Sequence, residues 1–219
     1  MRYLEFRDSF HDSILFNTHE LLVKHPQFHI NRLSEWRKKG YIIALRKGYY
    51  IFADIELNHY IHFLIANTLY QPAYISLETA LSYHNLIPEI VYAHTSVTTR
   101  LPRQFHNTPG VYTYNQIKPA AYRGYQLLPI PQHTRKVKVA FPEKALLDYL
   151  YLHPELAAPD DFLSLRLNLD ALNQLDFTRL QVFSSLFNQK TVTRRVNALL
   201  KSYNYPGRLA TTGERAPSC

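Results

Sequence analysis

The chain contains almost no cysteine, since Cys219 is the only one among its 219 residues. One thiol excludes both a disulfide framework and a thiolate metal cluster. The six glycines are too widely spaced for the dinucleotide-binding G-x-G-x-x-G pattern, the P-loop or the G-x-S-x-G nucleophile elbow. The eleven histidines include no H-E-x-x-H sequence. Because the common enzyme signatures are missing, we expect a protein without catalytic residues, cofactor or bound metal.

Long apolar segments are missing as well. The longest stretch without Asp, Glu, Lys or Arg covers residues 57–77 and includes His59 and His62, which is typical of a core helix and not of a membrane span. Residues 1–12 hold no uninterrupted apolar segment of the kind found in secretory signals. The 46% of hydrophobic residues suffices for a core. We therefore expect a soluble, cytoplasmic protein.

Acidic residues are scarce in two parts of the chain. Overall, 25 Lys and Arg stand against 17 Asp and Glu, for a net charge of +8. Residues 24–50 hold seven basic residues and one acid, Glu35, while residues 90–142 hold seven basic residues and no acid. Such segments are typical of proteins that bind polyanions, because each contact to a phosphate releases condensed counterions. The alternative is a basic surface that only keeps the protein in solution.

The first 54 residues favour a small DNA-binding domain. Residues 17–24 predict a short helix with Asn17 or Thr18 as its N-cap, and residues 28–39 predict a second helix that ends at Gly40. The second helix is expected to turn three side chains inward, those of Ile30, Leu33 and Trp36. Two strands, 41–46 and 49–52, follow around the turn at Lys47. Helix, turn, helix and β-hairpin is the winged helix-turn-helix plan.

Six side chains of this region are predicted to contact DNA: Asn31, Arg32, Lys38, Lys39, Arg46 and Lys47. Asn31 and Arg32 have the chemistry to read base edges, whereas the other four are suited to phosphates. Glu35 can accept from cytosine, but a pair within its own helix is the preferred interpretation. Winged helices also mediate protein contacts, so a protein partner stays open as an alternative.

Residues 55–205 predict an α+β domain. Helices are expected over 57–69 and over 77–83, the latter capped by Ser76, and a basic, mainly antiparallel sheet is expected between residues 93 and 140. A helix beginning at Phe141 precedes further helices over 159–167, 177–187 and 191–203. Residues 206–219 are rich in Gly, Pro, Ser and Thr and predict a disordered tail.

Several polar groups in this domain could be mistaken for active-site residues. Glu143, Lys144 and Asp148 are interpreted as the first turns of a helix with an exposed charge pair, not as an acid–base cluster. His59 and His62 have a spacing that could bind metal but lack a third ligand. The adjacent acids at 160 and 161 look like an ordinary helix cap, which argues against a nucleic-acid-modifying enzyme.

Three segments of the second domain resemble a known family. Residues 74–88 (YISLETALSYHNLIP), 95–100 (TSVTTR) and 139–152 (VAFPEKALLDYLYL) together resemble the antitoxin of the AbiE abortive-infection toxin–antitoxin systems, and residues 40–52 look like the wing that precedes the antitoxin domain there. The resemblance extends over residues 16–203. The high Tyr and His content and the helices after residue 152 depart from the pattern.

The resemblance implies a phage-defence antitoxin that represses its own operon by binding inverted repeats and that counteracts, directly or indirectly, a nucleotidyltransferase-like toxin. It implies DNA contacts from the helix 28–39 and the wing tip 46–47, and it supplies no catalytic residue. A second polyanion, which could be operator DNA, RNA or an acidic toxin surface, is expected on seven basic residues: Arg100, Arg103, Lys118, Arg123, Arg135, Lys136 and Lys138. The alternative is a stand-alone winged-helix transcriptional regulator whose second domain senses a ligand or a protein partner.

Overall fold

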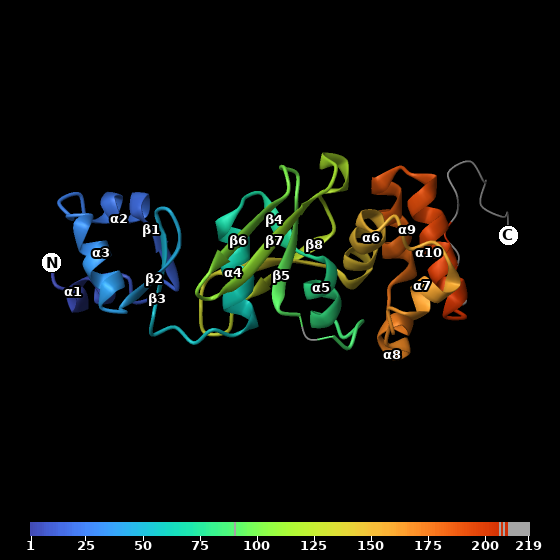
Figure 1. Ribbon diagram of the computed structural model, residues 1–219, viewed down its shortest axis with the longest axis horizontal. Helices are drawn as coiled ribbons and strands as arrows, with labels where there is room; N and C mark the ends of the chain where they lie inside the picture. Colours follow the sequence, from blue (N-terminus) through green and yellow to red (C-terminus); the bar gives the residue numbers. More distant parts are fainter. Residues whose placement is uncertain (90, 206, 208, 210–219) are drawn as a thin grey trace.

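The computed structural model describes residues 1–89, 91–205, 207 and 209, and its fold is α+β. Three parts follow one another along the longest axis (Figure 1). A small N-terminal unit lies at one end, a six-stranded sheet with its helices lies in the middle, and a group of helices that includes α9 and α10 lies at the other end. The elements of each part are close in sequence.

The N-terminal unit combines helices with a three-stranded antiparallel sheet. Its elements are α1 (Tyr3–Ser9), β1 (Leu15–Asn17), α2 (Thr18–Lys24), α3 (Asn31–Lys38), β2 (Ile42–Arg46) and β3 (Tyr49–Phe52). The strands have the order β1-β3-β2. Helices and sheet enclose a mostly aromatic core made of Phe6, Phe10, Phe16, Leu21, Phe28, Leu33, Trp36, Ile42 and Phe52. α1 and β1 are additional elements that the sequence analysis does not predict.

Most predicted boundaries in this unit are confirmed. Asn17 caps α2, because its Oδ1 accepts a hydrogen bond of 2.8 Å from the backbone N–H of Glu20. α3, however, begins at Asn31 and not at residue 28. The prediction that Ile30 points inward is wrong, since its side chain is 47% exposed. Phe28 packs against Trp36 instead, with a centroid distance of 5.4 Å, because the turn before α3 directs Phe28 into the core.

The central sheet has the strand order β6-β7-β5-β4-β9-β8. Its strands are β4 (Ala73–Ile75), β5 (Ala93–Thr98), β6 (Arg103–Asn107), β7 (Gly110–Gln116), β8 (Tyr125–Pro129) and β9 (Lys136–Ala140). Three pairs are antiparallel, as the sequence predicts, but β4–β9 and β5–β7 are parallel. The sheet also reaches beyond the predicted range, because β4 lies in its interior.

Helices cover both faces of this sheet. Tyr114 of β7 donates a hydrogen bond of 2.6 Å to the carbonyl of Ala66 on α4 (His59–Leu69), so this face of the sheet packs on α4. The pairing places Tyr114 beside Ser96 and Ile75 in one row, and Tyr74 therefore points to the opposite face. There the hydroxyl of Tyr74 bonds Asp148 of α6 (Pro142–Leu152), which packs beside α5 (Leu77–Tyr83).

The remaining helices pack at the far end from the N-terminal unit. They are α7 (Pro159–Leu163), α8 (Leu169–Asn173), α9 (Phe177–Phe187) and α10 (Lys190–Ser202). The bounds of α9 agree with the prediction, α10 begins and ends one residue early, α7 is shorter, and α8 is an addition. Within the part of the chain that the structure describes, no helix is long and apolar enough to cross a membrane.

The predicted tail falls mostly outside the described residues, which include only Gly207 and Leu209 of it. Leu209 is buried, and its backbone N–H and carbonyl both bond the side-chain amide of Asn197 on α10, at 2.7 and 2.9 Å. This residue of the predicted tail therefore packs against the last helix.

Candidate nucleic-acid interface

The exposed side of α3 is polar. Leu33 and Trp36 anchor the helix, and the Trp36 ring lies 4.7 Å from that of Phe6. The side chains left in solvent are those of Asn31, Ser34, Glu35, Arg37, Lys38 and Lys39. Three predicted contacts, Asn31, Lys38 and Lys39, are therefore exposed on one helix. Arg37 is not among the predicted contacts, although its place beside Lys38 could have suggested it.

Arg32 is placed differently from Asn31. Its side chain is half-buried, and Nη1 donates a hydrogen bond of 2.9 Å to the carbonyl of Met1. It lines a hollow of about 490 Å³ together with Met1 and with His25 and Phe28 from the turn that precedes α3. The two side chains predicted to read bases therefore differ in their access to DNA. Asn31 is exposed, whereas Arg32 is half-buried and bonded to the carbonyl of Met1.

The hairpin tip is held from two sides. The backbone N–H of Thr18 donates to the Gly48 carbonyl at 2.9 Å, which ties the tip to α2. On the outer edge of β2, the Asn107 amide of β6 donates to the Leu45 carbonyl at 3.1 Å. Lys47 is exposed, but Arg46 is half-buried. The wing tip therefore presents mainly Lys47.

Arg46 lies between the N-terminal unit and the central sheet. Its guanidinium carbon is 4.1 Å from the centroid of the Tyr49 ring, and its Nε is buried without a hydrogen-bond partner among the described residues. Burial raises the pKa of Tyr114 on β7, and the positive charge of Arg46 opposes that increase. The position of Arg46 is better suited to contacts between the two parts of the chain than to contact with DNA.

The seven basic residues predicted for the second domain divide into three groups. The first group is Arg135, Lys136 and Lys138, which line a groove of about 440 Å³ beside the C-terminal half of α4. Lys136 is exposed, Lys138 lies over the Tyr125 ring, and Arg135 is 3.9 Å from a carboxylate oxygen of Glu20 on α2. We call this the basic groove.

The other two groups lie elsewhere. Arg100 and Arg103 are exposed beside the Tyr70 ring, with their guanidinium carbons at 4.8 and 5.7 Å from its centroid. Arg100 also donates to the carbonyl of Gln71, which lines the basic groove, so this second group borders the first. Lys118 and Arg123 flank the short 3₁₀ helix η1 (Pro119–Ala121), which contacts α9.

Lys144 and Asp148 are not an exposed charge pair, so that prediction is wrong. Both side chains are fully buried and form an ion pair one turn apart on α6. Lys144 Nζ also donates to the Tyr74 hydroxyl at 2.9 Å, and Asp148 Oδ2 accepts from Tyr74 at 2.9 Å and from Ser76 at 2.8 Å. Burial lowers the pKa of Lys144 and raises that of Asp148, while their mutual attraction opposes both changes.

The same network changes the expected roles of Ser76 and Glu143. Ser76 occupies the N-cap position of α5, but its hydroxyl bonds Asp148 and makes no cap hydrogen bond. Glu143 is also buried, and both of its carboxylate oxygens have partners. Its Oε1 accepts a hydrogen bond of 2.8 Å from the backbone N–H of Asp176, and its Oε2 lies 3.5 Å from Arg179. These groups join α6 to the sheet and to α9, and their lack of solvent contact argues for a structural role.

The histidines of α4 lie among aromatic rings. His59 contacts Tyr60, with their centroids 4.0 Å apart. His62 stacks on His94 at 4.2 Å and makes a hydrogen bond of 2.9 Å to the Tyr112 hydroxyl. Burial lowers the pKa of both stacked rings, and that of His94 falls to about 4. Among the residues that the structure describes, no three His, Cys, Asp or Glu side chains are arranged to hold a metal ion.

Comparison with known proteins gives no family for this chain. No family model matches it, and no curated protein matches it significantly.

Proposed function

We propose that residues 1–54 are a winged helix-turn-helix that binds DNA through α3. The single observation that carries this proposal is the polar, solvent-exposed side of α3. The opposite side of the helix is anchored in the core by the buried Trp36. The order α1-β1-α2-α3-β2-β3, with an antiparallel sheet β1-β3-β2, agrees with a winged-helix arrangement. In such a module the second helix of the helix-turn-helix enters the major groove and the wing approaches the backbone.

Each exposed side chain has a role in this arrangement. Asn31 at the N-terminus of α3 would form the bidentate contact that asparagine makes with adenine. Lys38 and Lys39 at the other end, and Lys47 at the wing tip, would bind phosphates and set the register of the protein on the duplex. Arg32 and Arg46 are less available, because Arg32 already donates to the Met1 carbonyl and Arg46 lies over the Tyr49 ring with its Nε buried.

We further propose that the whole protein is an autorepressing cytoplasmic antitoxin of the AbiE kind. The three segments that resemble the family support this, because they adjoin one another in space. Tyr74 and Ser76 from the first segment bond Asp148 from the third. Thr95 from the second segment donates to the Ser76 carbonyl at 2.9 Å. The resemblance therefore concerns one connected part of the molecule, the junction of β4, β5, α5 and α6.

DNA binding is tested with the full chain and a labelled duplex containing the promoter upstream of its own gene. A variant with Asn31→Ala, Lys38→Ala and Lys39→Ala should bind about tenfold or more weakly, because each good base contact contributes about 1–3 kcal/mol. The matched control replaces two exposed basic residues of α10, Arg194→Ala with Lys201→Ala, and should bind within about twofold of the parent protein. Equal binding by both variants would contradict the assignment.

Antitoxin activity is tested by expressing the chain together with the product of the adjacent gene. Growth rescue with co-purification would mean neutralisation through a direct complex, and growth rescue with separate elution would mean indirect antagonism. Promoter binding without any rescue would favour the alternative, a stand-alone transcriptional regulator. The two assays separate the two halves of the proposal, because DNA binding and rescue are measured independently.

A further inference from the structure

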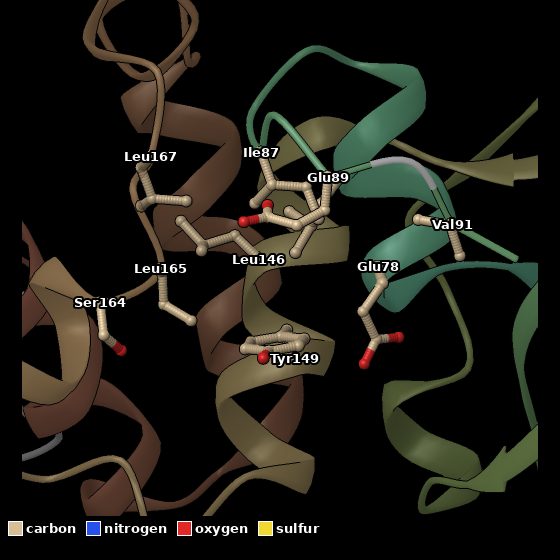
Figure 2. A pocket seen from close by; sticks show the side chains of 10 residues that line it. Glu78, Ile87, Glu89, Val91, Leu146, Tyr149, Ser164, Leu165 and Leu167 are labelled. Carbon is tan, nitrogen blue, oxygen red and sulfur yellow. The ribbon is translucent and has the colours of Figure 1, made fainter. Parts of the chain in front are cut away.

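A cavity of about 330 Å³ lies between α5, α6, the segment 164–167 and the residues Ile87, Glu89 and Val91 (Figure 2). Its apolar walls come from several elements, with Leu81 on α5, Leu146 on α6, and Leu165 and Leu167 from the segment between α7 and α8. A volume of this size is at the lower end of the range for small-molecule sites. The cavity shares no residue with α3, the hairpin tip or the basic groove.

Two carboxylates line this apolar cavity. Glu78 extends from the first turn of α5 on the side of Tyr149, and Glu89 extends across the mouth toward Leu167 (Figure 2). The backbone of Glu89 is held in place, because its carbonyl accepts a hydrogen bond of 2.9 Å from the Ser82 hydroxyl. Its carboxylate pairs with Arg166 at the rim.

The Glu78 carboxylate has an acceptor left over. Its Oε1 lies 3.9 Å from Nε2 of His153, whose Nδ1 already bonds Glu155 at 2.6 Å. Its Oε2 is excluded from solvent and has no hydrogen-bond donor among the described residues. A carboxylate oxygen without a donor is unfavourable, and because the Glu78 side chain as a whole is 36% exposed, its carboxylate can turn to meet a donor in the cavity.

The two charged side chains that line the cavity are both carboxylates, although the chain as a whole carries a charge of +8. Burial raises the pKa of Tyr149 in the cavity wall, and the carboxylates around it, Glu78 first, raise it further. An anion or a nucleic acid would be repelled here. A hard divalent cation is also a poor match, because it requires about six or more oxygen ligands and most of the lining side chains are aliphatic.

We propose that this cavity binds a small organic cation, in which an ammonium or amidinium group is attached to an apolar alkyl or aryl body. The cationic group would donate to the Glu78 carboxylate and approach the carboxylate of Glu89. The apolar body would lie against Leu81, Leu146 and Leu167. The cavity shares no residue with the side chains proposed to bind DNA or with the basic groove, but five of its lining residues (Glu78, Leu81, Ile87, Leu146 and Tyr149) belong to the segments that resemble the antitoxin family. Ligand binding is measured directly, so its failure would be distinguishable from failure of the DNA-binding or antitoxin proposal.

The test is a titration of the full chain, labelled with nitrogen-15, observed by two-dimensional NMR. The probes are 2-phenylethylammonium, hexylammonium and benzamidinium, each compared with its uncharged analogue, 2-phenylethanol, 1-hexanol or benzamide. At least one cation should give saturable shifts at amides around Leu81 and Leu146, with a Kd of roughly 1 mM or below, as expected of a fragment in a matching pocket. Its uncharged analogue should bind at least about fivefold more weakly.

Glu78→Gln is the decisive variant, because it keeps the shape of the side chain and removes its charge. It should weaken binding of the cation about tenfold and leave binding of the uncharged analogue unchanged. The matched control is Asp160→Asn, which removes an exposed carboxylate of α7 that does not line the cavity and should leave the Kd unchanged. Glu89→Gln provides a second test if Glu78→Gln lowers the melting temperature. The proposal is overturned if no cation gives localised, saturable shifts, if charged and uncharged probes bind equally, or if folded variants at 78 and 89 both bind like the parent protein.

Discussion

Lys144 and Asp148 form an ion pair in which neither side chain has contact with solvent. The pair lies on one face of α6. Asp148 also accepts hydrogen bonds from the hydroxyl of Tyr74 on β4 and from that of Ser76, which follows β4. Removing both charges from water is costly, and the pair tolerates this only while each member compensates the other. The pair therefore joins α6 to the central sheet, provided that both charges are present.

Removing one member alone should strongly destabilise the protein. Lys144→Met leaves the Asp148 carboxylate buried without its counter-charge, and the free energy of unfolding should fall by about 3–5 kcal/mol. Urea unfolding followed by circular dichroism measures this change. The double variant Lys144→Met with Asp148→Leu should lose less than the sum of the two single changes, because it leaves no unpaired charge. A loss below about 1 kcal/mol in both single variants would show that the pair contributes little.

The ion pair also shows where sequence reasoning stops. Lys and Asp four residues apart are typical of an exposed helix surface, and the sequence alone does not show that β4 and α9 cover that surface. Local signals are more reliable, since Asn17 caps α2 as predicted. The parallel pair β4–β9 joins strands far apart in sequence, and the parallel pair β5–β7 skips the intervening strand β6. Short apolar runs do not specify such partners.

The residues of the candidate interface also divide into those whose exposure follows from local structure and one, Arg46, whose surroundings come from a distant segment. Asn31, Lys38, Lys39 and Lys47 are exposed, as a DNA contact requires, and their exposure follows from the local helix and turn. The same hairpin predicts Arg46 as a DNA contact, but the second domain packs beside it, since Asn107 of β6 bonds the carbonyl of the preceding residue, Leu45, from 62 positions along the chain. Burial by such a distant segment cannot be read from the hairpin sequence.

Gly124 should tolerate alanine much less well than Gly40. Both have positive φ, +82° and +74°, so alanine strains each by about 1 kcal/mol or slightly more. A Cβ at Gly124 would also lie 3.0 Å from Cγ of the buried Lys144 and 3.1 Å from the ring of Phe183, whereas nothing lies within 4 Å at Gly40. Gly124→Ala should therefore cost about 1–3 kcal/mol more than Gly40→Ala in urea unfolding. Equal costs would mean that the Lys144 stem moves aside freely.

The stacked histidines should make stability depend on pH. The pKa of His94 is about 4 in the folded protein and near 6.5 when unfolded, so the unfolded chain binds more protons between these values. Stability should accordingly fall as the pH is lowered from 6.5 toward 4, and this group should account for about 2 kcal/mol after allowance for its partial exposure. Unfolding measured from pH 7 to pH 4.5 should show a smaller loss for His94→Gln than for the parent protein.

Other ionisable groups also titrate in this range, so the comparison with His94→Gln isolates the stacked ring. His62 faces His94, and the Tyr112 hydroxyl stays neutral because burial raises its pKa. Parallel pH profiles for the two proteins would exclude a contribution from this stack.

DNA binding should depend on salt in a way that separates phosphate contacts from base contacts. Lys47→Ala removes one proposed phosphate contact, so the slope of log affinity against log salt should decrease by about 0.9. Asn31→Ala should leave this slope unchanged and instead reduce the preference for the operator over unrelated DNA, by about 1–3 kcal/mol. Fluorescence anisotropy at several salt concentrations gives both values. A change of slope in Asn31→Ala, with none in Lys47→Ala, would reverse the assignment of the two residues.

The basic groove should matter for neutralisation of the toxin. Lys136→Glu with Lys138→Glu reverses two charges in the groove while leaving Arg135 in place, because Arg135 lies 3.9 Å from Glu20 and its loss would also alter the contact with α2. The matched control, Lys118→Glu with Arg123→Glu, makes the same change of charge beside η1, outside the groove. If a polyanion or an acidic toxin surface binds in the groove, the new glutamates would face charges of the same sign, which costs several kcal/mol. The groove variant should then reduce survival on toxin induction about tenfold or more, and the control should not. Full rescue by the groove variant, at an unchanged melting temperature, would assign neutralisation to another surface.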